Sequence, residues 1–154
     1  MFETIRHFFK TVSRADNPIH FDENDHRLAA AALLTHAMLA DGTVRAAEQN
    51  ALKSTLKRHY ALKPDELDEL IREGAEADNN SVDFYAFTSV LKRSLDHPGR
   101  EAIVEMLWEI VLVDGVVHEL EDNVVWRVAE LLGVETRERV LLRQRVEARL
   151  AEHG

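Results

Sequence analysis

The sequence predicts an all-α fold, a single-domain helical bundle of about seven or eight helices with an internal pseudo-twofold duplication. Three observations support this prediction. Apolar residues recur with helical spacing along almost the whole chain. Most of the 6 glycines and 3 prolines fall between these periodic segments, where helices begin or end. No run of residues alternates apolar and polar side chains for long enough to form a strand.

Composition agrees with one soluble domain and excludes several classes of protein. The chain has 154 residues, of which 45% are hydrophobic and 31% charged, and it contains no cysteine. A chain of this size buries enough surface to fold without a metal ion or a disulfide. The lack of cysteine excludes a disulfide scaffold, a thiolate zinc site and a cysteine nucleophile. The formal charge of −9 argues against nucleic-acid binding, because neutralising phosphates requires a basic face.

Eight helices are predicted in chain order, over residues 2–14, 24–40, 45–60, 64–77, 82–95, 99–113, 118–132 and 136–151. Pro64 suits the first turn of the fourth helix, and Gly133 suits the end of the seventh. The sequence Asp-Asn-Asn-Ser at 78–81 is typical of a turn. We expect residues 1–24 to form an N-terminal amphipathic helix and linker, and residues 25–154 to form the helical domain.

The first predicted helix carries an apolar stripe of Phe2, Ile5, Phe9 and Val12. Such a stripe indicates either packing on the core or contact with a partner or a membrane surface. The longest apolar run, residues 28–40, is shorter than the roughly 20 residues that a membrane span needs. No signal peptide is recognisable. We therefore expect a cytoplasmic protein without a direct membrane span.

Two segments, 28–40 and 102–113, are apolar over most of the helix circumference. Helices of this kind are usually buried, so we expect these two at the centre of the bundle. Trp108 and Trp126 are also expected in the core. If the two helices pack antiparallel with pseudo-twofold symmetry, the segments that follow them are brought near one another.

A short acidic motif occurs twice, as ADGTVRAAE at 40–48 and as VDGVVHELE at 113–121. Both copies fit Asp-Gly-x-Val-x-x-x-Glu, and equivalent residues are separated by 73 positions, as in Asp41 and Asp114. Each copy follows one of the two apolar helices and precedes an amphipathic helix. A duplicated helix-turn-helix pair is the simplest explanation of this arrangement.

The motif reproduces the second half of a calcium-binding EF-hand loop, with an Asp, a turn Gly, an aliphatic residue and a Glu in that order. The first half of that loop is missing from both copies, so neither can form an ordinary EF-hand. If the copies face each other, Asp41, Glu48, Asp114 and Glu121 form one oxygen-rich site for a divalent ion of unknown identity. These four residues are the predicted metal ligands.

The same motif also has a purely structural interpretation, which the sequence leaves open. The two glycines would supply a positive φ at the turn, and the two glutamates would interact favourably with the following helix dipole. Against a capping role, the N-cap positions three residues before the glutamates hold Arg45 and His118. Neither is a favoured N-cap residue, so the capping box is incomplete in both copies.

Other candidates carry weaker signals. His36 precedes Asp41 by five residues, and Glu109 is its counterpart at the 73-residue offset. Each is either part of a metal site or an ordinary hydrogen-bonded core residue, and His118 is a further candidate ligand. The acidic segment 65–83 is either solvated surface or a docking surface for a basic partner. No phosphate-binding loop, nucleophile elbow or zinc-protease motif occurs, so we expect no enzymatic activity and no catalytic residue.

The duplicated motif, the segment MLWEIVLVDGVVHELE at 106–121 and the segment RVAELLGV at 127–134 resemble the TerB-type tellurite-resistance family. The resemblance covers roughly residues 25–150, and the same domain type is similar to the N-terminal part of membrane-anchored DnaJ-like co-chaperones. It implies an all-α bundle with internal duplication, metal chelation by the four acidic residues named above, and a role in tellurite and general stress response without enzymatic activity. The chain departs from the family pattern at Arg45 and His118, where small hydroxyl residues are more typical. A cation at Arg45 would weaken divalent binding.

Two functional hypotheses follow. In the first, the chain is a non-enzymatic TerB-like stress-response domain whose ion occupancy tightens the bundle, and the tightened form docks a protein partner. In the second, it is a metal-independent adaptor with purely architectural Asp-Gly turns, which binds through the N-terminal helix or through the acidic segment 65–83. The sequence leaves a homodimer open and identifies neither the ion nor the partner.

Overall fold

The computed structural model describes residues 19–153, and within that range it contains seven α-helices and no strand. In chain order these are α2 (His26–Met38), α3 (Ala46–Tyr60), α4 (Pro64–Asn80), α5 (Tyr85–Ser94), α6 (His97–Val111), α7 (Glu119–Leu132) and α8 (Thr136–His153). The predicted all-α class is confirmed. The helix predicted over residues 2–14 lies outside the described residues.

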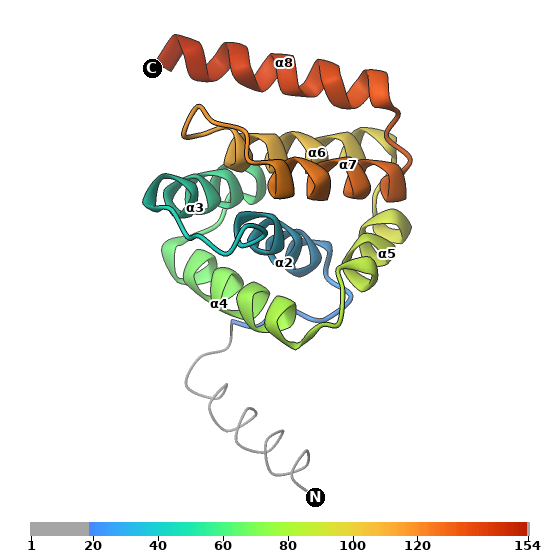
Figure 1. Cartoon of the computed structure of the whole chain (residues 1–154). Helices are drawn as coiled ribbons and strands as arrows, with labels where there is room; N and C mark the ends of the chain where they lie inside the picture. The colour runs from blue at the N-terminus through green and yellow to red at the C-terminus, as the bar shows by residue number, and fades with distance from the viewer. Residues whose placement is uncertain (1–18, 154) are drawn as a thin grey trace, which may run out of the picture.

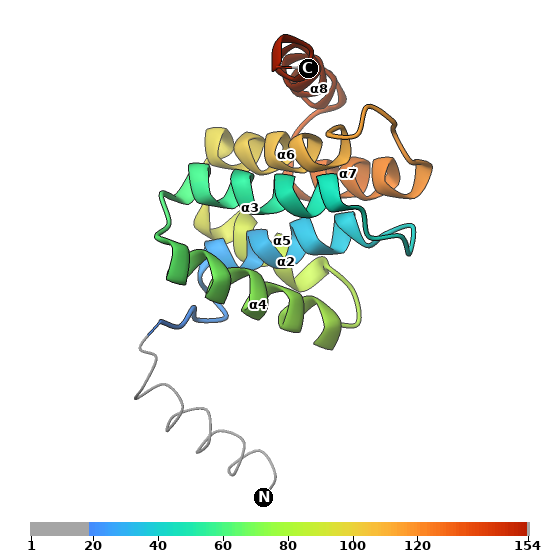
Figure 2. The same cartoon turned by 90° about the vertical axis from the view of Figure 1, so that its left-hand side faces the viewer.

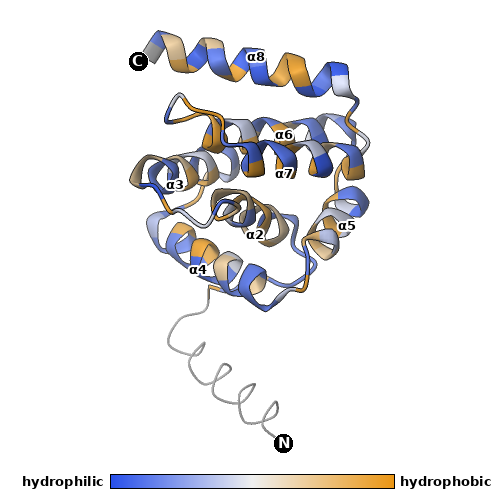
Figure 3. Cartoon of the chain, viewed as in Figure 1, coloured by the Kyte–Doolittle hydropathy of each residue, from blue (hydrophilic) through white to orange (hydrophobic). Residues whose placement is uncertain are grey.

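Helix α2 is the centre of the bundle, and α3, α4, α5, α6 and α7 all pack against it (Figure 1). Ten of its thirteen residues are buried, and Figure 3 shows that its surface is largely apolar. Helix α6 is the second buried helix. Its Trp108 is 2% exposed and donates a hydrogen bond from Nε1 to the Arg139 carbonyl. The two helices predicted to be central are therefore buried as expected.

Helix α4 approaches α2 closely at Gly74, where an added Cβ would lie 2.8 Å from the Ala31 Cβ. A side chain at this position would force the two helices apart. Helix α4 also continues beyond its predicted end, and the turn predicted at 78–81 was wrong. Asp78 lies in the last helical turn, where its Oδ1 is 2.9 Å from the His36 Nδ1 on α2. This contact between helices favours the additional turn.

The two acidic turns lie at the same end of the bundle. Helices α2 and α6 both run towards that end (Figure 2), so the antiparallel packing considered from the sequence was wrong. Each turn contains a glycine at positive φ, 78° at Gly42 and 80° at Gly115. The aspartate of each turn accepts a hydrogen bond of 3.1 Å from the backbone N–H two residues later, at Thr43 or Val116. Because both helices end on the same side, the turns that follow them meet.

The buried face of α7 differs from the prediction at Trp126. This residue, expected in the core, is 41% exposed, and Leu120 of the same helix is 53% exposed. Glu121 is instead buried completely. Successive residues of a helix point about 100° apart. A helix that turns Glu121 inward therefore places Leu120 at the surface.

Helix α8 lies at the outside of the bundle, against α6 and α7 (Figure 1). Leu142 and Val146 are its buried anchors, and Arg149 forms ion pairs with Glu105 and Glu109 of α6 at 3.0 and 2.8 Å. Among the described residues, no helix is both long enough and apolar enough to span a membrane.

Candidate metal centre

Four carboxylates meet where the two acidic turns lie together, and we call Asp41, Glu48, Asp114 and Glu121 the acidic cluster. The Arg45 guanidinium lies among them. Its Nη2 is 2.7 Å from an oxygen of Asp41, and its Nη1 is 2.9 Å from an oxygen of Glu48. The same group reaches the second motif, with Nη1 3.4 Å from Glu121 and Nε 3.8 Å from Asp114. The structure thus brings together all four residues that the sequence indicated.

Local structure explains how these side chains reach one point. The two aspartates belong to the turns after α2 and α6, and the two glutamates lie in the first turns of α3 and α7. Arg45 and His118 are the N-cap residues of α3 and α7, and neither side chain caps its own helix. Both side chains are therefore available to the acidic cluster.

Glu48 and Glu121 are both 0% exposed. In each of them one oxygen, Oε2, is buried and has no hydrogen-bond partner among the described residues. A buried carboxylate oxygen without a partner carries a desolvation cost that a proton or a cation can offset. These two oxygens are therefore the places in the cluster where positive charge is most needed.

The cluster also perturbs the protonation of its members. Burial, together with the neighbouring Glu48, raises the pKa of Glu121 to about 8, and Asp41 acts in the same direction. The Arg45 charge opposes this rise but is outweighed. Two carboxylates close together in a dry environment cannot both ionise freely. Glu121 therefore retains a proton at neutral pH when no further cation is bound.

The two aspartates behave in the opposite way. A hydrogen bond from Arg45, and a second from the backbone of the turn, lower the pKa of Asp41. Burial opposes ionisation of Asp114, but a backbone hydrogen bond from its own turn and the neighbouring His118 and Arg45 lower its pKa overall. Both aspartates are thus ionised at neutral pH and face the shared centre.

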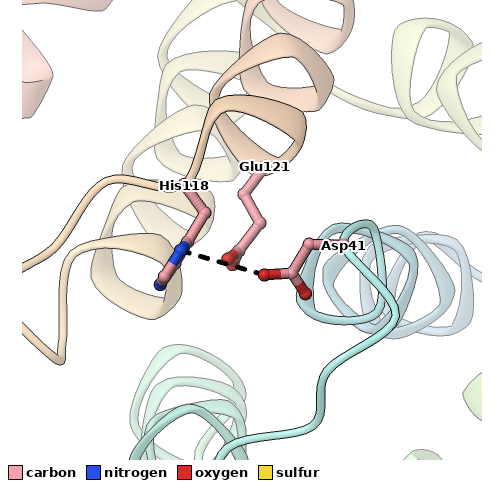
Figure 4. A group of neighbouring side chains, drawn as sticks. All are labelled: Asp41, His118 and Glu121. Carbon is pink, nitrogen blue, oxygen red and sulfur yellow. Dashed lines mark ion pairs between the residues drawn. The ribbon is translucent and has the colours of Figure 1, made fainter.

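His118 belongs to the same site, whereas His36 does not. The His118 Nε2 is 3.2 Å from an oxygen of Asp114, and its Nδ1 is 3.9 Å from an oxygen of Asp41. Figure 4 shows His118 and Glu121, both at the start of α7, opposite Asp41. Ligand atoms of these three residues lie within 4.8 Å of one another, a separation suited to a shared metal ion. His36 instead pairs with Asp78 on another side of α2.

A groove with a volume of about 550 Å³ lies between the end of α2, the end of α4 with the segment that follows it, and α7. Its apolar walls include Leu39, Val82 and Leu120, which are 40%, 102% and 53% exposed. Leu39 is two residues from Asp41, and Leu120 directly precedes Glu121. The groove therefore shares its walls with the segments that carry the acidic cluster.

An all-helical bundle with a carboxylate cluster built from two Asp-Gly turns defines a class of small helical domain with an acidic centre. The chain matches the family model described as tellurite resistance protein TerB over residues 27–144, and it belongs to that family. No curated protein and no solved structure matches it. The expected family is thereby confirmed.

Two features of the site were missed by sequence reasoning. Arg45 was expected to lie beside the cluster, whereas its guanidinium lies within it and contacts all four acids. The groove was not anticipated, because its walls come from segments that are far apart in the sequence. The one available signal was the unusual pair of N-cap residues, Arg45 and His118, at equivalent positions of the two motifs.

Proposed function

We propose that this TerB-family chain is a non-enzymatic, cytoplasmic stress-response domain that binds a divalent cation at the acidic cluster and docks a protein partner. The observation that supports this best is the pair of fully buried glutamates, Glu48 and Glu121. Each has one oxygen without a hydrogen-bond partner in the part of the chain that the structure describes. They lie beside two aspartates whose pKa values are lowered. Buried acids in this number are stable only if positive charge reaches them.

The donor set fits a hard divalent cation. Carboxylate oxygens are the preferred ligands of Ca²⁺, Mg²⁺ and Mn²⁺, and an imidazole such as that of His118 also suits Zn²⁺. The four acids and His118 would hold the ion, which would supply charge neutralisation. Arg45 brings one positive charge to a cluster of four carboxyl groups. The residues present are therefore compatible with a further divalent charge.

Ion binding is expected to act on the shape of the bundle. The ligands come from two motifs, one between α2 and α3 and the other between α6 and α7. An ion shared by both turns would hold the end of α2 against the start of α7. Because Leu39 and Leu120 belong to the same two segments, this would also fix the walls of the groove.

Thermal unfolding of the full chain with and without added Ca²⁺, Mg²⁺, Mn²⁺ or Zn²⁺ tests this proposal. A ligand that binds only the folded state at a hundredfold excess over its dissociation constant stabilises that state by about 2.7 kcal/mol. We expect at least one of the four ions to raise the melting temperature, and the double variant Asp114→Asn with Glu121→Gln to abolish the rise.

A matched control removes two carboxylates from the other group of close metal-ligating side chains found among the described residues, His97, Glu101 and Glu138. The double variant Glu101→Gln with Glu138→Gln should keep the full response to the ion. If no ion shifts the midpoint of the unaltered chain, cation binding is wrong. Equal loss of the response in both double variants would show that the acidic cluster is not its source.

One observation favours the second candidate, a metal-independent adaptor. Because Arg45 already contacts all four acids, the cluster has an internal counter-ion that could hold the two turns together permanently. The same melting experiment separates the candidates. An adaptor requires stability that is independent of all four ions and a docking surface that works without them.

For both candidates we propose that the partner binds in the groove and that the segment it inserts is a basic amphipathic helix. Apolar walls at Leu39 and Leu120 suit the apolar face of such a helix. The acids Asp78 and Asp83, which also line the groove, suit its cations. A synthetic helix of leucine and lysine should bind, as measured by fluorescence anisotropy. Leu120→Asp should abolish this binding and leave the response to the ion intact. Equal binding of a leucine and glutamate helix would contradict the assignment.

A further inference from the structure

We propose that Arg45 is a tethered cation that occupies the acidic cluster and competes with the divalent ion for the same oxygens, so that it sets the affinity of the site. This inference rests on the proposed function, since it assigns a regulator to that cation site. It concerns a residue at which this chain departs from the pattern of the family it resembles.

The contacts of Arg45 support competition rather than simple proximity. Its three guanidinium nitrogens are directed at one oxygen of each acid, over distances of 2.7 to 3.8 Å. The Asp41 oxygen that it contacts, Oδ2, is also the one nearest His118. An ion that coordinates this set of oxygens would therefore have to take over contacts that Arg45 makes. Two cations at such short distances also repel each other strongly.

Arg45 nevertheless leaves the cluster incompletely neutralised. One positive charge faces four carboxyl groups, and the buried Oε2 atoms of Glu48 and Glu121 find no hydrogen-bond partner within residues 19–153. A divalent ion brings twice the charge and is compact enough to be surrounded by oxygens. Exchange of the guanidinium for the ion is thus favoured by charge and opposed by the contacts that Arg45 loses.

The position of Arg45 in the fold permits this exchange. It is the N-cap residue of α3, and its side chain makes no capping hydrogen bond. The side chain is 24% exposed, so the guanidinium has a route to solvent. Departure of the side chain from the cluster would leave the helix start intact. His118, at the equivalent position of the second motif, would remain beside both aspartates.

Isothermal titration calorimetry of the full chain with Ca²⁺, Mg²⁺, Mn²⁺ and Zn²⁺, each in turn, tests the inference. We expect Arg45→Ala to bind the ion at least tenfold more tightly than the unaltered chain. Without the ion this variant should melt at a lower temperature than the unaltered chain. Addition of the ion should raise its melting temperature by more. Arg45→Lys keeps the charge and should keep the weaker affinity. Arg45→Gln is a second uncharged variant, in case the alanine variant fails to fold.

Arg58→Ala is the matched control, because Arg58 is another α3 arginine paired with a poorly exposed acid, Glu109, at 2.7 Å. It should change stability but not affinity for the ion. Equal affinity of the unaltered chain, Arg45→Ala and Arg45→Gln would overturn this inference and leave the proposed cation site standing. Binding only by the uncharged variants would support the inference and refute cation binding by the natural sequence. No binding by any variant would overturn both.

Discussion

Two groups of poorly exposed carboxylates in this bundle differ in the balance of charge around them. The first is the acidic cluster, in which four acids share the guanidinium of Arg45 and the imidazole of His118. The second, which we call the Glu109 network, consists of Glu109 with Arg58, His59 and Arg149. Glu109 is 8% exposed. Its carboxylate oxygens lie 2.7 Å from a nitrogen of Arg58, 2.8 Å from one of Arg149 and 3.6 Å from one of His59.

The pKa values of Glu121 and Glu109 differ because the balance of charge around them differs. Burial and the neighbouring acids Glu48 and Asp41 together raise the pKa of Glu121 to about 8, against the opposing charge of Arg45. Burial also acts on Glu109, but His59 and Arg58 outweigh it and lower the pKa of that carboxyl. A buried acid is therefore not a sign of a binding site by itself. An excess of buried acids over cations is the better sign, because it leaves negative charge that a ligand can neutralise.

The largest effect is expected in the Glu109 network. Glu109→Gln removes a charge that joins α3, α6 and α8. Arg58 loses this ion pair, whereas Arg149 keeps its pair with Glu105. Breaking a fully buried pair costs about 3–5 kcal/mol. Because the Arg58 and Arg149 side chains are 60% and 44% exposed and can turn to water, we expect a loss of about 2 kcal/mol. Denaturant unfolding at pH 7 measures it.

The exposed Asp65 of α4 supplies the control for that measurement. Asp65→Asn should change the free energy of unfolding by less than about 0.5 kcal/mol, as is usual for surface sites. If Glu109→Gln costs no more than Asp65→Asn, the network contributes little to stability. The proposed difference in stability between the Glu109 network and the acidic cluster would then be wrong.

The helices of this fold could be predicted from local signals, but some of their ends could not. The glycine at 133 ends α7 as expected, with φ at 75°, because that conformation suits glycine in particular. The end of α4 was predicted too early, because Asp-Asn-Asn-Ser is typical of a turn. The additional helical turn is accompanied by the contact of Asp78 with His36, which is 42 residues distant in sequence. A local pattern holds no information about such a partner.

The members of the acidic cluster could be predicted because the same spacing occurs twice in the chain. Their arrangement could not. The relative direction of α2 and α6 depends on packing between helices. The two turns meet only because these helices run in the same direction. The position of Arg45 could not be predicted either. Most arginines are exposed, and nothing in the local sequence indicates that this side chain lies within the cluster.

The second prediction concerns Glu121 and has the opposite sign to that for Glu109. The pKa of its carboxyl is about 8 in the folded chain and 4.5 for an ordinary glutamate, which represents the unfolded chain. Between these two values the folded state holds a proton that the unfolded state has lost. Stability from this group is therefore greatest below about pH 4.5 and is lost as the pH rises through about 8.

Glu121→Gln removes this titration and keeps the shape of the side chain. Measured by denaturant unfolding without divalent ions, the stability of the variant relative to the unaltered chain should increase steadily between pH 5 and pH 9. We expect the variant to be more stable at pH 9 by about 1.4 kcal/mol, the equivalent of one pKa unit. This is smaller than the loss expected for Glu109→Gln. A difference that stays constant with pH would mean that Arg45 already neutralises the cluster, and the two groups of carboxylates would then be alike.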